Sequence, residues 1–161
     1  MSVSTPVPIS SCARATSTEE ARYRIDYPLA AARNTRVVAL DEAAEMIVRA
    51  ASEEDWGQAR FYVAHDPGHD LITMDGDTVP LAGELEQSNT VVMVSTAGEN
   101  AEAAATIGAA CKVRGIMTAG LVITPGRLSS EALLTLRPYA RILLVPADED
   151  DLVELLRATR A

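Results

Sequence analysis

The feature that most constrains the fold is a regular alternation of short, β-branched apolar runs with segments of helical periodicity. The clearest run, Thr90–Val94, has the composition of a strand that is buried on both faces. Between such runs, apolar residues recur at helical spacing, as they do over Asp41–Asp55. Strands that alternate with helices form a parallel sheet with helices on its faces. The sequence therefore predicts an α/β fold, a three-layer sandwich with a mainly parallel, Rossmann-like sheet.

The predicted elements follow one another at short intervals from residue 41 onward. Strands are expected at Arg60–Ala64, Leu71–Met74, Thr90–Val94, Leu121–Thr124 and Arg141–Val145. Helices are expected at Asp41–Asp55, Asn100–Arg114, Ser130–Arg137 and in a last segment that Asp148 caps. The first two strands lie too close in sequence for a helix between them, so a tight or irregular loop must join them. The run Asp75-Gly76-Asp77 predicts a hairpin-type turn.

Composition limits the class of protein. The 161 residues, 48% of them hydrophobic, suffice for one domain with a core. With 23 acidic against 14 basic residues, the formal charge is −9, which argues against nucleic acid and anionic lipid as partners because both need clustered cations. No apolar run approaches the roughly 20 residues of a membrane helix. Cys12 and Cys111 lack the spacing of a zinc or redox pair and are expected to be free thiols in a reducing cytoplasm.

The chain is expected to divide into two parts. Residues 1–25 are rich in Ser, Thr and Pro and lack the apolar segment of a secretory signal, so they predict a flexible N-terminal arm. Residues 26–161 are expected to form a single α/β domain. The location predicted from these features is cytoplasmic.

Three loops follow predicted strands at their carboxyl ends, where open α/β sheets bind ligands. In the loop Ser95–Asn100, Gly98 permits a close approach of the backbone, and the next helix offers unpaired N–H groups to an anion. Ser95, Thr96 and Asn100 add hydroxyl and amide groups, which makes this loop a candidate phosphate site. The same residues can instead cap the helix, with Glu99 complementing its dipole. A Glu99 carboxylate turned inward would repel an anion.

The stretch Ser95-Thr-Ala-Gly-Glu-Asn-Ala-Glu102, after an apolar strand and before an Ala-rich helix, resembles the second half of sugar isomerase (SIS) domains. In that family a Ser-x-Ser-Gly-x-Thr/Ser loop and the helix start hold a sugar phosphate. The resemblance spans Thr90–Thr124 and implies phosphate or hydroxyl contacts for Ser95, Thr96, Gly98 and Asn100. The chain departs from the family pattern at two positions, where Ala97 replaces a serine and Asn100 a threonine.

A second candidate loop is His65-Asp-Pro-Gly-His-Asp70, which holds both histidines of the chain. Imidazoles titrate near neutral pH, so His65 and His69 are candidates for acid/base catalysis, including the proton transfers of an aldose–ketose isomerisation. Two histidines beside aspartates could also bind a divalent metal ion. The plainest interpretation is a polar turn between two strands.

In the third loop, Arg127 is a candidate contact for an anion, although a solvated surface arginine is the plainer interpretation. The leading hypothesis is that the chain binds a small phosphorylated, sugar-like metabolite without a cofactor or a resident metal, and isomerisation of that metabolite is the candidate reaction. A first alternative is a non-catalytic subunit or assembly module, and a second is a metal-dependent hydrolase that uses the His65–Asp70 loop. The expected partners are a small anionic ligand and either further copies of the chain, in a homo-oligomer, or other subunits of a complex.

Overall fold

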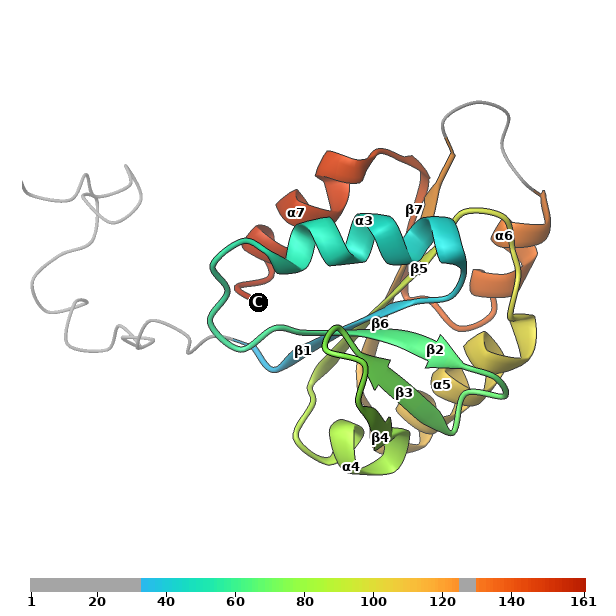
Figure 1. Cartoon of the computed structure of the whole chain (residues 1–161). Coiled ribbons are helices and arrows are strands. Elements are labelled where there is room, and N and C mark those ends of the chain that lie inside the picture. Colours follow the sequence, from blue (N-terminus) through green and yellow to red (C-terminus); the bar gives the residue numbers. More distant parts are fainter. Residues whose placement is uncertain (1–32, 125–129) are drawn as a thin grey trace, which may run out of the picture. The chain divides into compact units, whose positions relative to one another are not determined.

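The computed structural model describes residues 33–124 and 130–161. In this part of the chain, seven strands form one sheet in the order β4-β3-β2-β1-β5-β6-β7 (Figure 1). The strands are β1 (Thr35–Ala39), β2 (Arg60–His65), β3 (Asp70–Thr73), β4 (Thr78–Pro80), β5 (Thr90–Ser95), β6 (Met117–Ile123) and β7 (Ile142–Ala147). The helices are α3 (Glu42–Ser52), α4 (Leu81–Glu86), α5 (Ala101–Arg114), α6 (Ser130–Leu136) and α7 (Glu149–Ala158).

The sheet is mainly parallel, as the sequence predicts. β1 pairs in parallel with both β2 and β5, and the parallel pairing continues through β6 to β7. The α/β class and the mainly parallel sheet are therefore confirmed, and the arrangement is compatible with a Rossmann-like sandwich. The exception is one edge, where β2, β3 and β4 pair antiparallel.

Two consecutive hairpins build this antiparallel edge. The close spacing of the first two predicted strands has its explanation here, because β2 turns directly into β3 with His65 opposite Asp70. The predicted turn at Asp75-Gly76-Asp77 is confirmed as the second hairpin, with Gly76 at a φ of +93°. There the N–H of Thr73 donates to the carbonyl of Asp77 at 2.8 Å. Gly76 suits this left-handed backbone because it carries no Cβ.

Three elements lie outside those that the sequence predicts: β1, β4 and α4. β1 begins with two polar residues, Thr35 and Arg36, and the Arg36 side chain is buried beside Glu84 of α4, with 3.5 Å between Nε and Oε2. A charged residue is rarely buried unless it has a partner. The sequence alone does not show that Glu84 is the partner of Arg36, so it does not predict a buried strand here. β4 and α4 have three and six residues, too short for periodicity to reveal.

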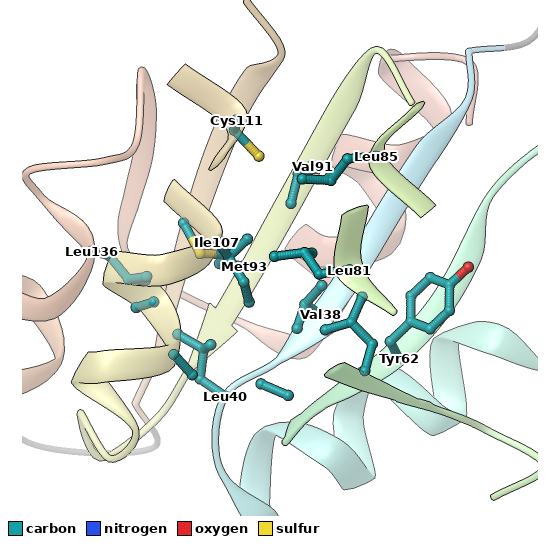
Figure 2. Close-up of a cluster of buried hydrophobic side chains, with 14 of the residues drawn as sticks. Val38, Leu40, Tyr62, Leu81, Leu85, Val91, Met93, Ile107, Cys111 and Leu136 are labelled. Carbon is teal, nitrogen blue, oxygen red and sulfur yellow. The ribbon is translucent and has the colours of Figure 1, made fainter. Parts of the chain in front are cut away.

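Two clusters of buried side chains form the core because successive residues of each strand point to opposite faces. Figure 2 shows the cluster that packs the sheet against α4, α5 and α6, with Val38, Met93 and Ile107 near its centre. The other cluster packs the sheet against α3 and α7 through neighbouring residues such as Val37 and Val94. Figure 1 shows α3 and α7 lying together along the same part of the sheet.

Some predictions fall outside the described residues. These are the arm over residues 1–25, the start of the domain at residue 26 and the position of Arg127. Within the described ranges, none of the helices has the length and apolar character that a membrane crossing requires.

Candidate functional site

The sheet reverses its order of connection between β1 and β5. β1 leads through α3 to β2 on one side, whereas β5 leads through α5 to β6 on the other side. Open α/β sheets bind ligands at the carboxyl ends of the strands at such a switch. The predicted loop Ser95–Asn100 lies there, as expected. The residue that faces it across the switch is Asp41, which follows β1 and was predicted only as the start of a helix.

Asp41 is the centre of a hydrogen-bond network that ties the two loops together. Its Oδ1 accepts from the N–H of Ala44 at 2.9 Å, which caps α3, and from the Thr96 hydroxyl at 2.6 Å. Its Oδ2 accepts from the N–H groups of Thr96 and Ala97 at 2.7 and 3.2 Å, and from the Ser95 hydroxyl at 3.3 Å. The residue is only 4% exposed.

These contacts keep the Asp41 carboxylate ionised. Burial raises the pKa of Asp41, but the hydrogen bonds from Thr96, Ala44 and Ala97 together lower that pKa by more, so it lies below its ordinary value. The N–H groups and hydroxyls of the β5 loop thus donate to an anion that belongs to the chain itself. A phosphate could use the same donors only by displacing Asp41.

The remaining residues of this loop also contact the fold. A Cβ built on Gly98 would lie 2.6 Å from the N atom of Ala132 in α6, so the close approach predicted for Gly98 is made to the chain's own backbone. The Asn100 amide donates to the carbonyl of Leu40 at the end of β1. The Glu99 side chain is exposed. The loop Ser95–Asn100, which follows β5, is therefore held to β1, α3 and α6 by hydrogen bonds and packing contacts.

His65 is the last residue of β2 and His69 lies in the turn before β3, and both side chains are exposed. The carbonyl of His65 accepts from Gly68 at 2.6 Å, which closes the turn. Gly68 packs against α5, since a Cβ there would lie 2.8 Å from the Cα of Ala103. Within residues 33–124 and 130–161, no three His, Cys, Asp or Glu side chains are placed to hold a metal ion. The loop has the geometry of a polar turn, and its catalytic role stays a prediction.

A cavity of about 790 Å³ opens beside the Asp41 network, on the side of the sheet that α3 and α7 cover. Met46 and Ile47 of α3 form an apolar wall, and Thr96 carries the network to the cavity surface. The start of α7 contributes acidic side chains. The described lining consists of Ala43, Met46, Ile47, Thr96, Ala97, Ile123, Thr124, Ala147, Asp148, Glu149 and Asp150.

Of the predicted ligand contacts in the described part of the chain, only Thr96 lines this cavity. The sequence does not single out the acidic start of α7 or the apolar residues of α3 as ligand contacts. A sequence signal for Met46 is that this large apolar side chain lies off the buried stripe of α3, and the structure leaves it 73% exposed. Thr124 also lines the cavity, and its hydroxyl has no hydrogen-bond partner among the described residues.

Comparisons with known proteins add no assignment. No model of a known protein family matches the chain, and a search of curated proteins found no match. The resemblance to sugar isomerase domains therefore stays a prediction from the sequence.

Proposed function

We propose that the chain binds a small molecule with a cationic or neutral polar group in the cavity at the carboxyl edge of the sheet. The observation that carries this proposal is the charge of the lining. Asp148, Glu149 and Asp150 all contribute to the cavity, and its described lining contains no Lys or Arg. Carboxylates at a partly enclosed site attract a cation and repel a phosphate.

The lining also supports a particular shape of ligand. Met46, Ile47 and Ile123 offer an apolar surface, while the acidic residues stand at the start of α7. An amine joined to a short apolar stem would satisfy both parts of the cavity. The volume of about 790 Å³ lies in the range of pockets for small molecules.

The proposed site shares Thr96 with the ligand site that the sequence predicts, but the rest of its described lining differs, and so does the charge of the ligand. A sugar phosphate would have to compete with Asp41 for the donors of the β5 loop. Isomerisation at His65 and His69 remains a separate hypothesis, because neither histidine is part of the cavity lining. We further propose that the fold is a three-layer, Rossmann-like sandwich, which the two separate core clusters support.

The test is a titration by NMR with small polar probes of different charge. Ethanolamine and putrescine are the cationic probes, glycerol the neutral one and glucose 6-phosphate the anionic one. The amines should shift the amide signals of Thr96, Ala97 and Glu149. The double variant Glu149→Gln/Asp150→Asn should weaken amine binding by about tenfold, which corresponds to about 1.4 kcal/mol.

The control is Glu154→Gln, which removes one negative charge from an exposed position of α7 outside the described cavity lining. It should change amine binding by less than about twofold. If glucose 6-phosphate binds in preference to the amines, and binds more tightly to the double variant, the phosphate hypothesis replaces the proposal. If no probe shifts these amides, the cavity is not a site for ligands of these classes.

A further inference from the structure

The edge of the sheet opposite the cavity described above, where α5 ends and β7 begins, contains another cavity. This cavity of about 420 Å³ lies between the last turns of α5, the start of β6 and the connection from α6 to β7. Lys112 of α5 and Arg141 before β7 both line it, and its described lining contains no acidic residue. We propose that this cavity is a binding site for a small molecule that carries a phosphate or carboxylate group.

Lys112 and Arg141 are both exposed, and neither takes part in an ion pair among the described residues. Other described arginines, such as Arg60, also form no ion pair. The distinguishing feature of Lys112 and Arg141 is therefore their position, because α5 and the segment before β7 place them around one cavity. Two cations without partners around a concave surface attract an anion.

Lys112 also complements the negative end of the α5 dipole, which accounts for a cation at that position. The dipole does not account for Arg141, which comes from a different element of the same cavity. The carbonyls at the end of α5 are themselves satisfied, since those of Cys111 and Lys112 accept from Ile116 and Gly115. The local field at the cavity is therefore set mainly by the two side-chain charges.

The walls of this cavity are fixed by packing and backbone hydrogen bonds. Tyr139 lies against Gly108, where a Cβ would come within 2.4 Å of its ring. The Thr118 hydroxyl donates to the carbonyl of Tyr139, and the N–H of Arg141 donates to the carbonyl of Thr118 at 2.9 Å. A rigid wall lowers the entropy lost when a ligand binds. Because Ile116 and Pro138 add apolar surface, an anion with an apolar ring should bind better than a bare one.

The experiment uses phenyl phosphate and inorganic phosphate as probes with the full chain. Phenyl phosphate should shift the amide signals of Gly115, Ile116 and Arg141, and it should bind more tightly than inorganic phosphate. The double variant Lys112→Ala/Arg141→Ala should raise the Kd by at least about tenfold. The conservative variant Lys112→Arg should retain binding, and added NaCl should weaken it.

Arg60→Ala is the matched control, because Arg60 is an exposed arginine outside the cavity lining. It should change the Kd by less than about twofold. Two results would overturn the proposal: no shift at these amides up to about 10 mM probe, or equal shifts in the double variant and the unchanged chain. Tighter binding of a glutamate-rich peptide, with shifts that extend to Arg137, would replace the small molecule with an acidic protein partner.

Discussion

The substitution Asp41→Asn tests whether the buried carboxylate holds the two loops together. Asparagine has nearly the same shape but carries no charge and has one acceptor oxygen in place of two. In the more favourable orientation of the asparagine amide, the oxygen still accepts from the N–H groups of Thr96 and Ala97. The amide nitrogen then faces the N–H of Ala44, which loses its acceptor. The Ser95 hydroxyl keeps the same oxygen as its acceptor, and the Thr96 hydroxyl can rotate and accept from the amide nitrogen, but the N–H of Ala44 cannot accept.

The expected loss of stability follows from these contacts. One backbone donor at the start of α3 loses its acceptor, which costs about 1–3 kcal/mol. Two hydrogen bonds change from a charged to a neutral acceptor, each weaker by about 1 kcal/mol. The free energy of unfolding should therefore fall by about 3–5 kcal/mol at pH 7.

The loss should depend on pH in a defined direction. Because the folded pKa of Asp41 lies below its unfolded value of about 3.8, its stabilisation is complete above that pH. It is lost as the pH falls through the folded pKa. The difference in stability between the natural chain and Asp41→Asn should therefore be constant near neutral pH and shrink below about pH 4.

Urea unfolding followed by the fluorescence of Trp56 measures the effect, since Trp56 is half-buried and is the only tryptophan of the chain. The matched control is Asp148→Asn at the exposed start of α7, which should cost about 1 kcal/mol or less. If Asp41→Asn costs no more than this control, or if its cost at pH 3 equals that at pH 7, the carboxylate does not hold the loops and the interpretation fails.

Two glycine substitutions, one in a packed loop and one in an open loop, test how closely the backbone approaches its neighbours. Gly98→Ala should destabilise the fold by about 2–4 kcal/mol, because its φ of +83° is strained for alanine and its Cβ would meet Ala132. Gly76→Ala has a similar φ but open space around it, so a loss of about 1 kcal/mol is expected, and equal losses in thermal unfolding would contradict the packing argument. Burial raises the pKa of the Cys111 thiol to about 11, which leaves about a hundredfold less thiolate at pH 8 than in an exposed cysteine. In a Cys12→Ser chain, Ellman's reagent should therefore react with Cys111 only on unfolding, and rapid reaction of the native protein would refute its burial.

The amino-acid sequence by itself determines the order of most strands and helices along the chain. Thr90–Val94 and Arg60–Ala64 lie in strands, and so does the predicted run at Arg141–Val145 apart from Arg141, because β-branched and aliphatic runs bury well in a sheet. The helix predicted at Asn100–Arg114 ends at Arg114 as expected, and Gly115 follows it with a φ of +67°. These are local properties, in which each residue acts through its own backbone and its nearest neighbours.

The site depended on contacts between residues far apart in the chain. Asp41 and Thr96 are 55 positions apart, and only the pairing of β1 with β5 brings the carboxylate to the loop that was expected to bind phosphate. Arg36 could be recognised as part of a strand only once Glu84 was known to lie beside it. The tertiary structure thus decided the charge of the candidate site, because electrostatic and hydrogen-bonding partners are chosen by distance in space, and the local pattern of a sequence records only distance along the chain.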